Sequence, residues 1–383
     1  MKIKKHLPTI ISLSICAIIF VVLLVVVRNN KTVASEDQNS YTTYELAKVE
    51  SVVSEDLKKE ELFENNYVGS QDLMITLKTG EFKGMLMTAQ NFLGALYGTK
   101  LKEGDPLVTS LYVENGNVQS IIVYEIDRSI PILIILGVFI AVTVLIGRRK
   151  GLRSLLGLIF TIVCYIGILI PLLMSGAPSI ITTLLICLYV AFVSYILLEG
   201  ITRKTVCAML GTTLGLFFAI GFGLLAQSLV KVDGMRIGDY VDALLQLKQG
   251  GSQLELKGLL IDGMIVASLG AIMDVAMSIA SSIQELVTVN PELTAKDIWK
   301  SGMNIGQDMI GTMTNTLILA FIGSSFVLVL YISSLNIPIH ELLSSNLVAT
   351  ELVHGIASSV GVIISVPLTV LISMFAYKKR TAK

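Results

Sequence analysis

"GAIMDVAMSIASSIQEL", residues 270–286, ends an apolar run that begins near residue 258, and it carries the charged side chain of Asp274 in its middle. A transmembrane α-helix needs about 20 mainly apolar residues, and the stretch 258–282 has that length. A charged side chain at the centre of such a helix costs at least ~2.5–3.5 kcal/mol on insertion scales. The stretch therefore predicts a membrane span with a polar group that requires a partner, water or a proton.

The composition of the whole chain is that of a polytopic membrane protein. Only 15% of its 383 residues are charged, whereas about a quarter is usual in soluble domains. The formal net charge is zero, and no basic tract or stacking motif is present, so we expect a lipid bilayer as its surroundings and no nucleic-acid partner. The four cysteines lie in apolar runs without metal-ligand spacing, and the histidines are scattered, so neither a metal nor a cofactor is expected.

The first apolar run, near residues 7–27, follows three lysines and predicts an N-terminal transmembrane anchor over residues 1–34. The alternative is a cleaved signal peptide, with "TVAS" as the cleavage site. However, the run is longer than the roughly 7–15 apolar residues of a signal peptide, and Arg28 and Lys31 separate it from "TVAS". An uncleaved anchor with a cytoplasmic N-terminus is therefore favoured.

Residues 35–128 are polar, charged and strand-like, and they predict a small extracytoplasmic all-β domain. "LMITLKTGEFKGMLMT" alternates apolar and polar residues before a Thr-Gly turn, and "PLVTSLYVENGNVQSIIVYEID" reads as a hairpin that turns at "ENGN". Together with "YELAKVESVV" these segments give about five short strands, enough for an OB-like barrel that closes its own edges. Its acids and lysines form no catalytic constellation and are expected on a solvated surface.

Seven further apolar runs follow in residues 129–383, so the sequence predicts a seven-helix membrane domain and eight spans in total. These runs lie near 130–147, 154–174, 179–198, 205–229, 258–282, 305–332 and 354–377. Lysines and arginines in the short loops all fall on the side that holds the N-terminal lysines, and the positive-inside rule makes that side cytoplasmic. Both termini are then cytoplasmic, and residues 35–128 lie outside.

Several other residues of these runs favour a structural interpretation. A GxxxG pair at 211–215 predicts close helix packing. Asp262 and Glu199 lie near the ends of their runs, where we expect water to solvate them. Glu351 and His354 have an E-x-x-H spacing that suits a metal inside a bundle, but the further carboxylates of such a site are missing.

Polar residues recur at helical spacing in two consecutive runs, each set on one helix face. The sets are Asp274, Ser278, Ser281 and Glu285 in the first run, and Asn304, Asp308, Gly311 and Asn315, with Thr312 alongside, in the second. The two runs are antiparallel, so Asp274 and Asp308 are expected at similar depths, about 7–9 Å from the cytoplasmic end. No lysine or arginine lies at a comparable depth in any run.

A cation bound between the two aspartates, or a proton taken up by one of them, would remove the cost of charge in the membrane. The sequence therefore predicts a cation or proton site between these two helices. Its candidate residues are Asp274, Asp308, Asn315, Ser278 and Thr312. The alternative is structural: the side chains reach water at the membrane surface or hydrogen-bond neighbouring helices to fix their packing.

"GAIMDVAMSIASSIQEL" and "SGMNIGQDMIGTMTNTLILAFIGSS" resemble the two signature segments of the YibE/F-like membrane proteins of Gram-positive bacteria. The resemblance extends from about residue 130 to the end of the chain and includes Asp274, Asp308 and Asn315. It implies a multi-pass plasma-membrane protein whose anchor and outer β domain are typical of YibE-type members. It also suggests a shorter relative of the family as a partner, beside self-association, but it supplies no activity or substrate.

The leading functional hypothesis is a transporter or permease-like protein in which Asp274 and Asp308 handle a cation or a proton. The alternative is a non-transporting cell-envelope scaffold or accessory subunit that acts through the outer β domain. An intramembrane aspartyl protease is a third hypothesis, but such proteases resemble one another in a GxGD motif. This chain reads "IGQD", with Gln307 in place of the second glycine, so no enzyme activity is expected.

Overall fold

The computed structural model describes residues 40–61, 66–232, 241–335 and 337–377. The chain divides into two compact units, of which one runs Thr32–Val142 and the other contains Thr143–Lys383. The predicted anchor near residues 7–27 lies outside the described residues.

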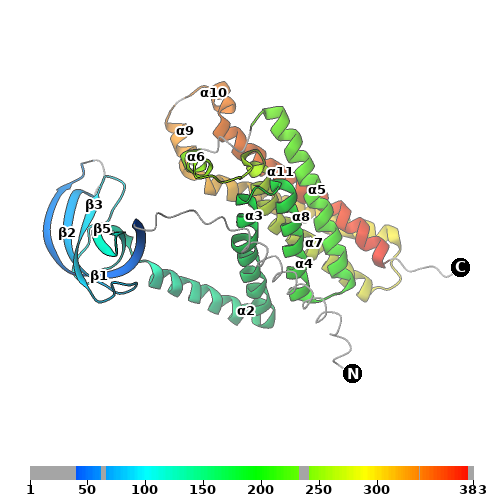
Figure 1. Cartoon of the computed structure of the whole chain (residues 1–383). Coiled ribbons are helices and arrows are strands. Elements are labelled where there is room, and N and C mark those ends of the chain that lie inside the picture. Colours follow the sequence, from blue (N-terminus) through cyan, green and yellow to red (C-terminus); the bar gives the residue numbers. More distant parts are fainter. Residues whose placement is uncertain (1–39, 62–65, 233–240, 336, 378–383) are drawn as a thin grey trace. The chain divides into compact units, whose positions relative to one another are not determined.

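Five strands form the sheet of the first unit (Figure 1). They are β1 (Ser40–Lys59), β2 (Tyr67–Leu77), β3 (Leu86–Leu93), β4 (Pro106–Glu114) and β5 (Asn117–Ile126). β1 pairs antiparallel with both β2 and β4, and the neighbours follow the order β1-β2-β3-β5-β4. β3 and β5 run parallel and meet at the pair Gln90 and Ile122. The predicted small β domain is therefore confirmed as a strongly curved five-stranded sheet.

The predicted alternation and the predicted hairpin turn both occur in this sheet. Along β2, Leu73, Ile75 and Leu77 are fully buried, whereas the residues between them are half-buried, because successive side chains of a strand point to opposite faces. Asn115 and Gly116 connect β4 and β5 with positive φ angles of 51° and 77°. A two-residue hairpin loop with both angles positive is the turn that Asn-Gly favours.

The rest of the described chain is helical. Its elements are α2 (Ser129–Cys164), the π-helical turn η1 (Tyr165–Leu169), α3 (Ile170–Met174), α4 (Ser179–Glu199), α5 (Arg203–Val230), α6 (Val241–Gln249), the 3₁₀ turn η3 (Leu256–Gly258), α7 (Leu259–Val289), α8 (Ala295–Ser324), α9 (Phe326–Ser334), α10 (Ile339–Ser344) and α11 (Asn346–Tyr377). The described chain is thus mostly helical, in agreement with the predicted fold class.

Five stretches of the described chain are long and apolar enough to cross a membrane, or six if a bent pair counts as one span. The bent pair is α8 with α9, which turn by 65° at the break between them. The predicted spans 130–147 and 154–174 fall within one helical stretch, which is broken at Arg148 by a φ of 48°. A count of five to six apolar helices is therefore what the structure supports, and the total of eight spans stays a prediction.

α5, α7 and α11 pack against one another at the centre of the second unit. A Cβ atom on Gly215 of α5 would lie 2.8 Å from Ser365 Cβ of α11 and 3.0 Å from Ile272 Cγ2 of α7. A Cβ on Gly361 of α11 would lie 2.7 Å from Ala219 Cβ of α5. A Cβ on Gly211 would collide with the Thr369 hydroxyl of α11. The GxxxG pair therefore packs helices together, as predicted, because its glycines let the neighbouring helices approach closely.

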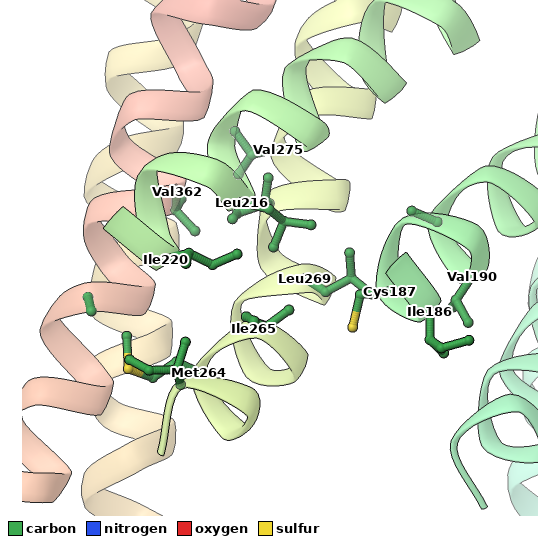
Figure 2. Close-up of a cluster of buried hydrophobic side chains, with 14 of the residues drawn as sticks. Ile186, Cys187, Val190, Leu216, Ile220, Met264, Ile265, Leu269, Val275 and Val362 are labelled. Carbon is green, nitrogen blue, oxygen red and sulfur yellow. The ribbon is translucent and has the colours of Figure 1, made fainter. Parts of the chain in front are cut away.

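An apolar core surrounds this crossing. Figure 2 shows its side chains: Leu216 and Ile220 from α5, Met264, Ile265, Leu269 and Val275 from α7, Val362 from α11, and Ile186, Cys187 and Val190 from α4. α4 thereby joins the central helices through its buried face. This core fixes the rotation of α7, and thus decides which of its polar residues are enclosed.

Substitution of the two glycines Gly215 and Gly221 of α5 separates packing from helix propensity. Gly221→Ala should raise the melting temperature slightly, because nothing lies within 4 Å of its Cβ position and alanine favours a helix by roughly 0.5–1 kcal/mol over glycine. Gly215→Ala should lower it, because overpacking costs typically about 1–3 kcal/mol. Thermal unfolding of both variants in the same detergent tests this, and equal shifts in one direction would contradict the packing described here.

Candidate functional site

The polar residues of α8 lie on the side of the helix opposite its packed side. On the packed side, a Cβ on Gly302 would lie 2.8 Å from Val370 Cγ1 of α11 and 3.1 Å from Ile283 Cδ1 of α7, and Gly306 is buried one turn further along. The α8 polar face is made of exposed residues: Asn304, Asp308, Gly311, Thr312 and Asn315. The predicted common face therefore exists, and it points away from α7 and α11.

The polar residues of α7 also lie on the side of their helix opposite its packed side. Ile272, Ile279 and Ile283 are fully buried on one side. The α7 polar face lies opposite them and consists of Asp274, Ser278 and Glu285, which are exposed, and Ser281, which is half-buried. Both polar faces thus remain on the outside of the described bundle.

The contacts between α7 and α8 give their register. Gly302 meets Ile283, and Gly306 meets Ile279, so the two helices run antiparallel with four-residue steps. The same register brings Asp274 to the level of Gly311, three residues from Asp308. At 1.5 Å per residue, the two aspartates differ in depth by about 4.5 Å along the helix axes. The similar depth that the sequence predicts is consistent with this register.

The aspartates have no counter-charge in the described chain. The described hydrogen bonds and ion pairs contain neither the Asp274 nor the Asp308 carboxylate, so nothing described links the two groups. The Thr312 hydroxyl donates within its own helix, 3.2 Å from the backbone oxygen of Asp308. Beside Asp274, the buried Tyr195 hydroxyl of α4 donates to the Met273 backbone oxygen over 3.0 Å. The five candidate residues therefore lie on two exposed faces, and their role in a site stays a prediction.

Asp262 is the buried acid of the bundle, and the expectation that water solvates it is wrong. Only 6% of its surface is exposed, and neither carboxylate oxygen has a hydrogen-bond partner in the part of the chain that the structure describes. Asp262 lies in the first turn of α7, against the start of α4, where Ser179 and Thr183 neighbour it. The position near a span end suggested solvation, but the packing of α4 on α7 buries the side chain there.

Glu199, the other acid that we expected to be solvated, is half-buried and has counter-charges. Its carboxylate forms ion pairs with Lys150 over 3.3 Å and with Lys204 over 2.9 Å. The two acids differ in their surroundings: Glu199 is neutralised by two lysines, whereas the described neighbours of Asp262 include two hydroxyl groups and another acid, Glu255, but no ion-paired lysine or arginine. Asp262 is therefore the functional candidate that the sequence reasoning missed.

A weak signal for the buried group is present in the sequence. Ser179, Thr183 and Cys187 are spaced four residues apart, so they share one face of α4. That spacing alone does not distinguish a polar lining from a lipid-facing surface, since small hydroxyl residues occur in both. The pairing of this face with Asp262 is a tertiary contact, and it becomes visible only in the structure.

The E-x-x-H pair does not gain the ligands that a metal would need. His354 is half-buried, with its ring 4.9 Å from that of Phe321, and its Nε2 atom has no described hydrogen-bond partner. Within the described ranges, no group of three or more His, Cys, Asp or Glu side chains is arranged to hold a metal ion.

The β domain carries its charges on the surface. The Lys100 ammonium lies 3.0 Å from Glu55 Oε1, and this hydrogen bond holds the pKa of the Glu55 carboxyl below its usual value. Both side chains are substantially exposed, so the pair adds little stability. Gln71, by contrast, is fully buried and bonds both the backbone N–H and the backbone oxygen of Leu101. These contacts serve the fold of the domain.

These features together define a helical, multi-pass type of membrane protein with polar groups in its helices and an N-terminal β domain. Comparison with protein families matches residues 135–379 to the YibE/F-like proteins, and the chain belongs to this family. A search of curated proteins found no match. No solved structure matched either.

Proposed function

We propose that the protein is a transporter or permease-like membrane protein whose α7 and α8 polar faces handle a cation or a proton. The observation that carries this proposal is the pair of exposed aspartates, Asp274 and Asp308, at similar depths on adjacent apolar helices. Ionisable residues within membrane helices mark ion and proton pathways more often than lipid-facing surfaces, because their exposure to lipid is costly. A cation or proton at this level would offset the negative charge.

The exposed polar faces also support an association of subunits. If acyl chains covered them, each ionised aspartate would cost at least ~2.5–3.5 kcal/mol. A second copy of this chain, or a shorter relative of the family, would cover the faces and form a shared polar path with them. Gly311 of the α8 polar face, and Gly270, one turn before Asp274 on α7, have nothing within 4 Å of their Cβ positions, so a neighbouring helix has room to approach closely.

The location that we propose is the bacterial plasma membrane, with both termini cytoplasmic and residues 35–128 outside. The ion pairs of Glu199 support part of this topology, because they join Lys150, just after the break in α2, and Lys204, in the first turn of α5, and the positive-inside rule assigns both lysines to the same side. We also propose that the β domain is OB-like. Its strand order, with β1 paired on both sides and a parallel β3–β5 contact, suits a partly open five-stranded barrel.

A second candidate function is that of a non-transporting envelope scaffold or accessory subunit. Its support is the surface of the β domain, where the exposed rings of Tyr44 and Tyr124 pack edge to face with centroids 5.2 Å apart. Exposed aromatic side chains are enriched where proteins bind one another. Under this function the β domain is the binding module, and Asp274 and Asp308 only fix helix packing.

Neutral substitutions of the two aspartates test the transport function. In proteoliposomes, Asp274→Asn and Asp308→Asn should each lower cation or proton flux by about tenfold or more, a loss of at least ~1.4 kcal/mol. Dyes for protons, sodium, potassium and magnesium would measure the flux. Glu292→Gln, in the exposed loop before α8, is the matched control and should leave flux unchanged. Equal flux in all variants, or no flux above that of empty vesicles in the unsubstituted protein, would contradict transport and favour the scaffold.

A bulky residue on the α8 polar face tests the association of subunits. Gly311→Leu should shift the protein from an oligomer toward a monomer, because the added side chain fills the space that a neighbouring helix needs. Gly221→Leu is the control, since its Cβ position on α5 is equally open but lies outside both polar faces. Native mass spectrometry from nanodiscs measures the subunit number. A monomeric unsubstituted protein, or an oligomer that Gly311→Leu does not affect, would contradict this part of the proposal.

A further inference from the structure

Asp262 and its neighbours form an enclosed group of polar atoms without partners. Asp262, Ser179 and Thr183 are 6%, 1% and 0% exposed. Neither carboxylate oxygen and neither hydroxyl has a hydrogen-bond partner within 3.5 Å among the described residues, although the two hydroxyls neighbour the carboxyl group. Buried polar atoms in proteins are bonded in the large majority of cases, so such a group requires a specific explanation. It lies 12 residues, or about 18 Å along α7, from Asp274 and is separate from the two polar faces.

Among the described residues, no ion pair compensates an ionised Asp262. The titratable groups around it are Glu255, which accepts the Ser179 backbone N–H over 3.2 Å, and Cys187, one turn beyond Thr183 on α4. On the α11 side, the His354 ring lies against the adjacent Gly263, with Glu351 near it. Tyr165 is another titratable group in this region, and its hydroxyl lies 3.5 Å from Cys187 Sγ.

The described ion pairs of the chain use other carboxylates, those of Glu55, Glu125 and Glu199. An ionised Asp262 would thus be a buried negative charge beside a second acid. A buried charge of this kind is so unfavourable that the group takes up a proton instead.

The packing around the group favours a proton over a metal ion. A Cβ atom on Gly258 would collide with the Ser179 hydroxyl, so the start of α4 already presses closely on the start of α7. A metal ion would need room and several more oxygen ligands, and the described residues offer no cluster of three metal-ligating side chains here. A proton adds almost no volume, and it turns the carboxylate into a hydrogen-bond donor.

We propose that Asp262 is a proton-binding site between α4 and α7, in which the protonated carboxyl donates a hydrogen bond to the hydroxyl of Ser179 or Thr183. The bound proton removes the negative charge. The hydrogen bond gives a partner to one carboxyl oxygen on α7 and to one hydroxyl oxygen on α4. Release breaks the O–H bond, the proton passes to water, and the carboxylate keeps the electron pair. The charge left behind favours entry of water and separation of the start of α4 from α7.

Infrared difference spectroscopy of the full-length protein in lipid nanodiscs tests this site directly. At neutral pH, the spectrum of the unsubstituted protein minus that of Asp262→Asn should contain the carbonyl band of a protonated carboxylic acid, shifted in D₂O. The matched control is Asp56→Asn, an exposed position on β1, whose difference spectrum should contain only carboxylate bands. Carboxylate bands in the Asp262 difference would overturn the proposal, as would an Asp262 signal that responds to sodium but not to pH.

Two further variants keep the test decisive if Asp262→Asn does not fold. Ser179→Ala and Thr183→Ala retain the carboxyl and each remove one hydroxyl acceptor. The acid band should move to higher frequency in the variant that loses the hydrogen bond. An unchanged acid band in both variants would overturn the assignment.

Discussion

The need to neutralise, solvate or cover an acidic side chain inside an apolar helix governs the structure of this protein. A membrane offers neither water nor counter-ions at depth, so every carboxyl group in it must be neutralised or covered by other means. The described chain accommodates its acidic side chains in three ways. Glu199 uses two lysines at the end of its helix, and Asp262 is enclosed among hydroxyls. Asp274 and Asp308 are left on exposed faces, and we propose that a further subunit or water completes their surroundings.

Helix packing decides whether each acidic side chain is buried or exposed. Gly215 and Gly361 bring α5 and α11 together, and Ile272 of α7 fills the space beside them. This contact fixes the rotation of α7, so that its isoleucines face inward and Asp274 faces outward. Asp262 is on the same helix, but three turns earlier it meets the start of α4 and becomes enclosed. One helix thus carries two acidic groups in opposite environments, one exposed and one buried, as a result of a single packing arrangement.

Much of the fold could be predicted from the sequence, because its local patterns are strong. The alternation of Leu73, Ile75 and Leu77 predicted β2, the Asn-Gly pair predicted the β4–β5 turn, and the apolar runs predicted the long helices. Helical spacing also predicted that Asp274 and Ser278 share a face. It could not predict the direction in which that face points, because the direction depends on contacts with other helices. Asp262 was misjudged for the same reason: its distance from a span end is local, whereas its burial under α4 is not.

We propose that protein or water, and not lipid, covers the acidic faces of α7 and α8. A cryo-electron microscopy structure of the protein in lipid nanodiscs tests it most directly. We expect helix density from a second subunit, or ordered water, against Asp274 and Asp308. Acyl-chain density in direct contact with both carboxyl groups, around a monomer, would contradict it.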